Sequence, residues 1–265
     1  MAFSPRSILI TGASSGIGRA LALDYAAPDM HLALNGRNRE RLEAVATECR
    51  AKGATVTLGV VDVRDRTGMA KWIFSVDDAH PIELAIANAG VAGGIGMGRL
   101  REHPDIARNV IATNLLGTIN TVDPLVERMC MHARGRIAVM GSIGGFRGLP
   151  ACPSYSASKA AVHAYAEGLR GALAPLGVGV TIIAPGFVAT ELNSDIVCPK
   201  PFLIDEPRAA RIIRRGLARE RAFIVFPRAL YYGSLLVRLL PRRWVDAALV
   251  AVEVDVPEKF DTWVD

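Results

Sequence analysis

Near its start the chain has a short apolar run that leads directly into a glycine-rich turn, Ser7-Ile8-Leu9-Ile10-Thr11-Gly12-Ala13-Ser14-Ser15-Gly16-Ile17-Gly18. A strand followed by such a turn and then a helix is the context in which proteins bind a dinucleotide. Glycines permit the tight turn and the close approach of the backbone to a pyrophosphate, and the helix N-terminus supplies N–H groups. The spacing is TGxxxGxG rather than GxGxxG. We therefore expect the dinucleotide to contact Gly12, Ser14, Ser15, Gly16, Ile17 and Gly18.

Further apolar and β-branched runs follow, separated by longer segments with helical periodicity. In the segment after the second run, Leu42, Val45 and Ala46 fall on one helix face, and Gly53 suits a C-terminal cap. Strands that alternate with helices predict an α/β fold with a doubly wound, parallel seven-stranded sheet and helices on both faces. No repeat or linker divides residues 1–265, so we expect a single domain. The predicted strands are 7–11, 31–35, 55–61, 83–88, 136–142, 178–184 and 222–226.

The end of the second predicted strand bears on the choice of cofactor. Asn35-Gly36-Arg37 lies about 20 residues after the glycine-rich turn, where an NAD-binding protein places a carboxylate for the ribose hydroxyls. No carboxylate is present there, and Arg37 offers a planar cation that suits a 2′-phosphate. This pattern favours NADP(H) over NAD(H). The alternative is a surface arginine that simply precedes a helix.

The glycine-rich turn also fits a motif of a different enzyme class. Gly12-Ala13-Ser14-Ser15-Gly16 matches the G-x-S-x-G nucleophile elbow of α/β-hydrolases, with Ser14 as the nucleophile. Such an elbow is expected after several strands and is followed by an acid and a late histidine. Here the motif closes the first strand, and the last histidine is His163, before the late strands. A serine hydrolase is therefore the alternative hypothesis.

Three later residues form a pattern that can carry chemistry. Ser142 ends the fifth predicted strand, and Tyr155 and Lys159 open the long helix that follows. Because they stand at i and i+4, Tyr155 and Lys159 share one face of that helix, with Cβ atoms about 5–6 Å apart. A free tyrosine has a pKa of about 10, and a neighbouring ammonium group stabilises the phenolate. We therefore expect Lys159 to lower the pKa of Tyr155 and make it an effective acid and base.

Together with other segments, this pattern makes about residues 7–192 resemble the short-chain dehydrogenase/reductase family. The resemblance implies an oxidoreductase that uses a nicotinamide cofactor to interconvert carbonyl groups and alcohols. Arg37 favours the direction of carbonyl reduction, since NADPH usually drives reductions. The motifs that carry the resemblance, in order, are TGASSGIG, Asp62, Asn88-Ala89-Gly90, Asn114, Ser142, YSASK at 155–159 and Pro185-Gly186.

The resemblance also implies a role for each matching residue. Tyr155 would exchange a proton with a substrate oxygen that Ser142 holds. Lys159 would bind the nicotinamide ribose, and Asn114 would anchor a water that relays protons to Lys159. A noncatalytic nucleotide-binding scaffold at a membrane is a further alternative. Cofactor contacts beyond the first turn are expected from Asp62, Val63, Asn88, Ala89, Gly90, Tyr155, Lys159, Pro185, Gly186, Val188 and Thr190.

Two C-terminal segments lie outside the resemblance. Residues 191–221 start with a stretch that holds three prolines, which predicts a loop or lid over the substrate. Residues 228–265 form an apolar and basic extension that Arg238 and Pro241 interrupt, so a membrane-spanning helix is not expected. The extension could lie on a bilayer, roof a hydrophobic substrate channel, or pack as a helix hairpin on the body or on a second subunit.

Charge is distributed unevenly along the chain. The net charge is +5, but residues 208–243 contain ten arginines and one acid, so this segment carries +9 and the remainder −4. A basic segment favours an anionic partner such as membrane lipid or an acidic carrier, or else it is a solvated basic surface. A nucleic acid is not expected.

We expect a fairly hydrophobic small-molecule substrate, such as a ketone, and a homo-oligomer of two or four subunits.

Composition indicates a globular protein, with 51% apolar and 22% charged residues. The cysteines show neither CxxC pairing nor a histidine cluster at metal-ligand spacing, so we expect neither a disulfide framework nor a metal site. Residues 1–11 hold too short an apolar run for a secretory signal. We therefore expect a cytoplasmic protein that could also contact the inner membrane surface peripherally. The cysteines are Cys49, Cys130, Cys152 and Cys198.

Overall fold

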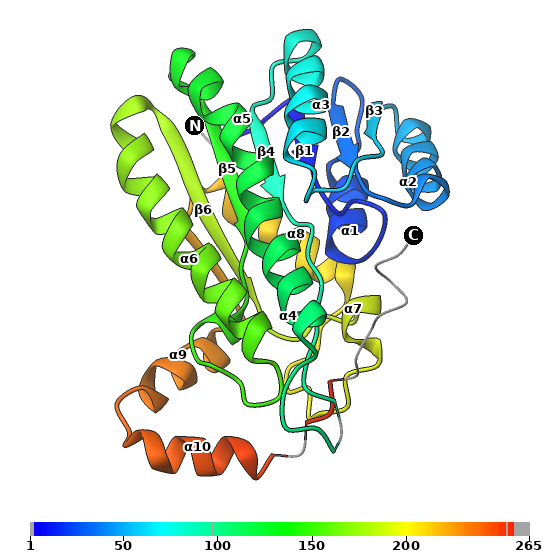
Figure 1. The fold of residues 1–265 in the computed structure, drawn as a ribbon. Helices are drawn as coiled ribbons and strands as arrows, with labels where there is room; N and C mark the ends of the chain where they lie inside the picture. Colours follow the sequence, from blue (N-terminus) through cyan, green and yellow to red (C-terminus); the bar gives the residue numbers. More distant parts are fainter. Residues whose placement is uncertain (1–2, 97, 253, 257–265) are drawn as a thin grey trace.

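A computed structural model of the chain describes residues 3–96, 98–252 and 254–256. Seven strands form one parallel sheet: β1 (Ser7–Ile10), β2 (His31–Asn35), β3 (Thr55–Gly59), β4 (Leu84–Ala87), β5 (Gly135–Met140), β6 (Val178–Pro185) and β7 (Phe223–Phe226). Their order across the sheet is β3-β2-β1-β4-β5-β6-β7 (Figure 1). The predicted seven-stranded parallel sheet is confirmed, and every predicted strand overlaps an observed one.

Helices cover both faces of the sheet. One face is covered by α1 (Gly16–Tyr25), α2 (Arg39–Ala51) and α8 (Glu206–Ala218), and the other by α3 (Arg66–Ala79), α5 (Gly117–Met131) and α6 (Pro153–Leu173). Side chains alternate between the two layers because successive residues of a strand point to opposite faces. Thus Ile8 and Ile10 pack into the first layer, while Leu9 packs into the second.

The strand order reverses between β1 and β4, which are neighbours in the sheet although two strands separate them in the chain. The chain runs outward in one direction from β1 and in the other from β4, so the loops that follow these two strands diverge. In doubly wound sheets the crevice between such loops is where ligands bind. The second part of the chain reaches this crevice through α4 (Pro104–Ile111) and a π-helical turn, Ala112–Leu116, which continues into α5.

The segment after β6 consists of a loop followed by a helix that packs into the core. Residues 191–205 contain the short helix α7 (Glu191–Ser194) and return along the loop through a parallel bridge between Val188 and Ile204. The following helix α8 packs against α1 and buries Ala209 and Ile213 in the core. The sequence predicts a loop or lid over residues 191–221, but only residues 191–205 form a loop, because residues 206–218 form the packed helix α8.

The C-terminal extension forms two helices, α9 (Arg228–Val237) and α10 (Arg242–Val250). The helix is broken at 238–241, where Arg238 and Pro241 interrupt the apolar pattern. Figure 1 shows both helices projecting from the lower end of the body; we refer to residues 228–252 as the arm. No helix in the described part of the chain is long and apolar enough to cross a membrane. Residues 253 and 257–265 of the predicted extension lie outside the described residues.

Candidate active site

A cavity of about 1220 Å³ lies at the carboxyl ends of the strands. Of the residues that the sequence predicts for the site, Gly18 and Asn114 lie just behind the cavity wall, and all the others line it. The lining residues among them are Gly12, Ser14, Ser15, Gly16, Ile17, Arg37, Asp62, Val63, Asn88, Ala89, Gly90, Ser142, Tyr155, Lys159, Pro185, Gly186, Val188 and Thr190.

The glycine-rich turn after β1 has no space for larger residues. Gly12 and Gly16 have φ angles of +64° and +58°, a region that favours glycine. A Cβ on Gly18 would lie 2.1 Å from the carbonyl oxygen of Gly12, so α1 packs directly against the turn. Ser15 precedes α1 without a side-chain capping bond, which leaves N–H groups of the first turn for an anionic ligand. These features fit the pyrophosphate of a dinucleotide.

Asn88 fastens this turn to the end of β4. Its Nδ2 donates hydrogen bonds to the carbonyl oxygens of Thr11 (2.9 Å) and Gly12 (3.2 Å). In return, Thr11 Oγ1 accepts hydrogen bonds from the backbone N–H groups of Asn88 (3.1 Å) and Ala89 (3.2 Å). The turn is therefore held rigidly at the place where the strand order reverses.

Opposite charges meet at the ends of β2 and β3. The Asp62 carboxylate accepts hydrogen bonds from Arg64 Nε (3.0 Å) and Nη2 (2.6 Å). Burial raises the pKa of Asp62, but the hydrogen bonds from Arg64 and the charge of Arg37 outweigh it and hold the pKa below its usual value. Asp62 is therefore ionised. Arg37 borders the cavity beside Gly36, where a Cβ would lie 3.3 Å from Ser14 Oγ.

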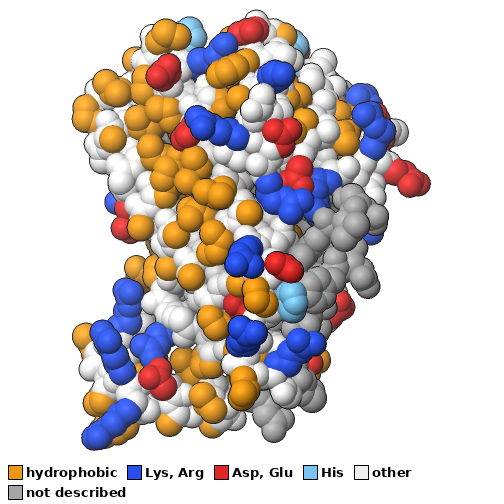
Figure 2. All heavy atoms as spheres, in the orientation of Figure 1, with side chains coloured by type: hydrophobic (Ala, Val, Ile, Leu, Met, Phe, Trp, Pro, Cys, Tyr) orange, Lys and Arg blue, Asp and Glu red, His pale blue; other side chains and the backbone are white. Residues whose placement is uncertain are grey.

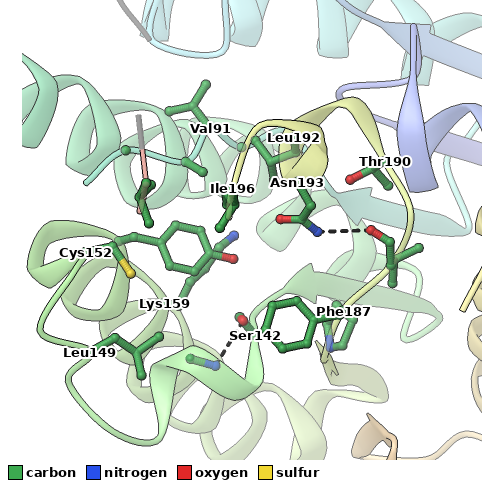
Figure 3. A pocket seen from close by; sticks show the side chains of 18 of the residues that line it. Val91, Ser142, Leu149, Cys152, Lys159, Phe187, Thr190, Leu192, Asn193 and Ile196 are labelled. Carbon is green, nitrogen blue, oxygen red and sulfur yellow. Dashed lines mark hydrogen bonds between the residues drawn. The ribbon is translucent and has the colours of Figure 1, made fainter. Parts of the chain in front are cut away.

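Ser142, Tyr155 and Lys159 come together in the wall of the cavity. Ser142 follows β5, and its Oγ accepts a hydrogen bond from the N–H of Gly144 (3.0 Å). Tyr155 and Lys159 lie one turn apart near the start of α6, and a Cβ on Gly144 would lie 3.4 Å from Ser142 Oγ and 3.5 Å from Tyr155 Cε1. Figure 3 shows Ser142 and Lys159 facing the cavity, with Leu149 and Cys152 to one side.

Burial shifts the pKa values in this cluster. Burial raises the pKa of Tyr155 above its usual value, although the neighbouring Ser142 side chain opposes this shift. Lys159 Nζ donates instead to the Met140 carbonyl oxygen (2.8 Å) and lies 5.8 Å from the centre of the Tyr155 ring. Burial also lowers the pKa of Lys159 to about 8. Burial is the largest cause of both shifts in this geometry, and the effect of Lys159 on the pKa of Tyr155 stays a prediction.

His163 is a site residue that the sequence analysis did not assign. Its Nε2 accepts a hydrogen bond from the backbone N–H of Ser142 (3.3 Å). A Cβ on Gly141 would lie 2.3 Å from that nitrogen, so the glycine lets the ring reach the end of β5. Burial, assisted by the charge of Lys159, lowers the pKa of His163 to about 4 and keeps the ring neutral. The repeated i, i+4 spacing from Tyr155 through Lys159 to His163 is the sequence signal that points to it.

Asn114 is fully buried in the π-helical turn between α4 and α5. Its Oδ1 accepts a hydrogen bond from the N–H of Val91 (2.8 Å), and its Nδ2 donates to the carbonyl oxygen of Val91 (3.0 Å) and to Ser158 Oγ (3.0 Å). A Cβ on Gly90 would lie 3.1 Å from Asn114 Oδ1 and 3.5 Å from Lys159 Nζ. Asn114 therefore ties the loop after β4 to α6 next to Lys159.

Away from the polar cluster the cavity wall is mostly apolar. Leu192 and Ile196, from the segment after β6, lie on the side opposite Ser142 in Figure 3. Residues of both arm helices complete the wall, so the arm roofs the cavity, one of the three arrangements expected for it. Val256 packs so closely on Gly94 that a Cβ there would lie 2.4 Å from the valine Cβ. The apolar lining includes Ile95, Leu149, Ile196, Val197, Leu230, Val237, Leu249, Val250, Val252 and Val256.

Sequence comparison agrees with this geometry. Residues 6–199 match the sequence pattern of the short chain dehydrogenase family. This chain belongs to that family. An uncharacterized oxidoreductase of Myxococcus xanthus is 37% identical to this short-chain dehydrogenase/reductase over 246 residues, which cover 92% of the present chain and 96% of that protein. The resemblance that the motifs indicate is confirmed, and the protein is an NAD(P)-dependent oxidoreductase.

Solved structures show the same fold. A short-chain dehydrogenase/reductase from Burkholderia phymatum in complex with NAD superposes with a TM-score of 0.81 at 23% identity, covering 90% of this chain and 94% of that one. A short-chain dehydrogenase from Sphingobium yanoikuyae in complex with NADPH superposes with a TM-score of 0.76 at 25% identity, covering 91% and 94%. The superpositions show that this short-chain dehydrogenase/reductase shares their fold.

The two alternative functions find no support in the site. A serine hydrolase that uses Ser14 needs a histidine within reach of the hydroxyl, and no described residue that lines the cavity is a histidine. Among the described residues there is also no cluster of potential metal ligands. Membership of the short-chain dehydrogenase family supports an enzyme rather than a noncatalytic nucleotide-binding scaffold.

Two buried histidines make the stability of the fold depend on pH. Burial lowers the pKa values of His31 and His163 from 6.5 to about 4. Below pH 6.5 the unfolded chain therefore takes up protons that these histidines refuse until about pH 4, so stability decreases as the pH falls. We expect the free energy of unfolding in urea to fall between pH 7 and pH 5 by about 2 kcal/mol per histidine. His163→Leu should remove half of this loss, whereas the exposed His132→Leu should not change it; equal stability at both pH values would contradict the burial argument.

Proposed function

We propose that the protein reduces a hydrophobic ketone with NADPH, or oxidises the corresponding secondary alcohol with NADP⁺. The observation that carries the proposal is the cavity, in which the polar cluster of Ser142 and Tyr155 adjoins a largely apolar wall. A carbonyl oxygen placed at these two hydroxyl groups would leave the rest of the substrate against apolar side chains such as Leu149 and Val237. Burial of that hydrocarbon part would supply binding energy without polar recognition.

The bound nicotinamide supplies or accepts hydride. Tyr155 donates a proton to the substrate oxygen during reduction, and Ser142 holds that oxygen through its hydroxyl group. Burial raises the pKa of Tyr155, so the phenol is protonated at neutral pH, which is the form that donates a proton. Lys159, with a pKa of about 8, exchanges protons near physiological pH and returns a proton to the Tyr155 phenolate. We propose that Asn114, which lies beside Lys159, holds a water for this relay.

Further residues are proposed to hold the cofactor. Thr190 faces the glycine-rich turn, because a Cβ on Gly16 would lie 3.5 Å from Thr190 Cγ2. The N–H of Gly186 donates to the carbonyl oxygen of Phe226 (2.7 Å), which anchors the end of β6. Pro185, Gly186, Val188 and Thr190 would hold the nicotinamide carboxamide and the pyrophosphate, and Asp62 and Val63 would hold the adenine. Asp62 would accept from the adenine amino group with the carboxylate lone pairs that Arg64 leaves.

The preference for NADP(H) rests on the end of β2. Arg37 borders the cavity near Ser14, and Asn35 rather than a carboxylate occupies the last position of β2. Asn35 is buried and donates through Nδ2 to the carbonyl oxygens of Gly59 (2.9 Å) and Val61 (2.8 Å), so it supports the loop rather than a ribose. A cytoplasmic homo-oligomer also remains our proposal, to be checked by sedimentation of the purified protein.

Turnover of a series of methyl ketones tests the proposed substrate class. We expect kcat/KM with NADPH to rise about fourfold for each added methylene group while the chain still lies within the apolar wall, because each buried methylene contributes about 0.8 kcal/mol. NADPH consumption is followed by absorbance, with NADH as the comparison. If kcat/KM does not change along the series, the proposal of an apolar substrate is rejected. Ester cleavage that Ser14→Ala abolishes would replace the oxidoreductase with a hydrolase.

A further inference from the structure

The arm exposes to solvent several large apolar side chains that do not line the cavity. Leu239, Leu236 and Trp244 are 82%, 66% and 60% exposed, and Tyr232 and Leu240 are also exposed. In α10 only Val245 is buried, so this helix makes little contact with the body. Large apolar side chains gathered on one projecting element are unfavourable in water and mark a surface that meets a partner.

The charges of the arm show what kind of partner fits. Arg228, Arg238, Arg242 and Arg243 are all exposed, and none forms an ion pair with a carboxylate in the described part of the chain. The single acid of the arm, Asp246, is paired with Arg147. Figure 2 shows basic and hydrophobic side chains side by side at the lower left, where the arm lies. A surface of this composition attracts anions and apolar material at the same time.

We propose that the arm docks the enzyme on a bilayer that contains anionic lipids. Leucine and tryptophan side chains at the tip enter the interface between headgroups and acyl chains, and the arginines meet the lipid phosphates. Neither helix of the arm, with ten residues in α9 and nine in α10, is long enough to span the bilayer, so the proposed contact is confined to one leaflet. A symmetric dimer through the same surface would bring the arginines of both copies into one interface, where their like charges repel.

Docking through the arm would also present the cavity to the membrane. Leu230, Val237 and Leu249 line the cavity from the same two helices that expose Leu236 and Trp244 on the outside. An apolar substrate dissolved in the bilayer would therefore reach the active site past the arm without crossing water. This second step rests on the proposed ketone substrate, whereas docking itself does not.

Vesicle flotation of the full chain tests the docking surface. We expect the wild-type protein to float with vesicles of phosphatidylcholine that contain 30% phosphatidylglycerol, and much less with pure phosphatidylcholine. Leu239→Asp combined with Trp244→Asp, and separately Arg242→Glu combined with Arg243→Glu, should each lower the partition coefficient at least about tenfold. These residues do not line the cavity, so turnover of a water-soluble ketone should stay unchanged.

Matched variants elsewhere on the surface serve as controls. Met131→Asp with Leu176→Asp replaces two other exposed apolar residues, and Arg211→Glu with Arg215→Glu makes the same charge change on α8. Both controls should float like the wild type. The proposal is overturned if the wild-type protein does not float, or if the controls lose as much flotation as the arm variants. It is also overturned if the wild-type protein binds no vesicles but forms a dimer that Leu239→Asp/Trp244→Asp converts to monomers. If the wild-type protein does not turn over ketones, the proposed function is rejected, but the docking result is unaffected.

Discussion

Replacement of Tyr155 by phenylalanine is expected to lower kcat for ketone reduction about 10³-fold, within the range of a positioned general acid. The change removes only the hydroxyl group of a ring that lies beside Ser142. The ring remains in place, so the dissociation constant of NADPH, measured by fluorescence titration, should change by less than about threefold.

Tyr165→Phe provides the matched control on the same helix. The Tyr165 hydroxyl donates to Asp123 Oδ1 (3.0 Å) and does not line the cavity, so its loss should leave kcat unaltered. If Tyr155→Phe kept more than about one tenth of wild-type turnover, a different group would have to supply the proton. A proportional loss in NADPH affinity would indicate a binding role instead.

Replacement of Arg37 by alanine is expected to change the choice of cofactor. Hydrogen bonds to a charged group are worth about 1.5–3 kcal/mol, so the dissociation constant of NADPH should rise about 10- to 100-fold. The dissociation constant of NADH should stay within about twofold of the wild-type value, because NADH has no 2′-phosphate. The wild-type preference for NADPH should then be largely lost.

Arg39→Ala serves as the control for Arg37→Ala. Arg39 begins α2, is exposed and does not line the cavity, so it reports how much of the effect comes from general positive charge near β2. Equal losses for NADPH and NADH in Arg37→Ala would refute a 2′-phosphate contact. Equal losses of NADPH affinity in both variants would assign the preference to the local field of the arginines rather than to Arg37.

Much of the fold follows from local patterns because the requirements behind them are local. The Gly12 and Gly16 positions need left-handed φ angles, and Gly18 needs the absence of a side chain, so the turn can be recognised from residues next to one another. The spacing of Tyr155 and Lys159 fixes a shared helix face in the same way. The predicted strands also hold, since burial on both faces requires continuous apolar runs.

The electrostatic behaviour of the site could not be predicted in this way. Burial is the largest cause of the pKa shifts of Tyr155 and Lys159, and the Lys159 ammonium donates to the Met140 carbonyl oxygen. His163 likewise becomes a partner of Ser142 only when β5 and α6 pack together. Desolvation depends on what surrounds a group in three dimensions, and the spacing of residues contains no such information.

The amino-acid sequence by itself determined the parallel sheet, the dinucleotide turn and the identity of the residues in the polar cluster, because these depend on backbone conformation and periodicity over short distances. Tertiary structure alone decided that the arm folds back to roof the cavity and that residue 255 pairs with Val197 across an antiparallel bridge. Contacts between segments so far apart in the chain depend on how helices and strands pack, and local residue preferences do not select among the arrangements that the arm could adopt.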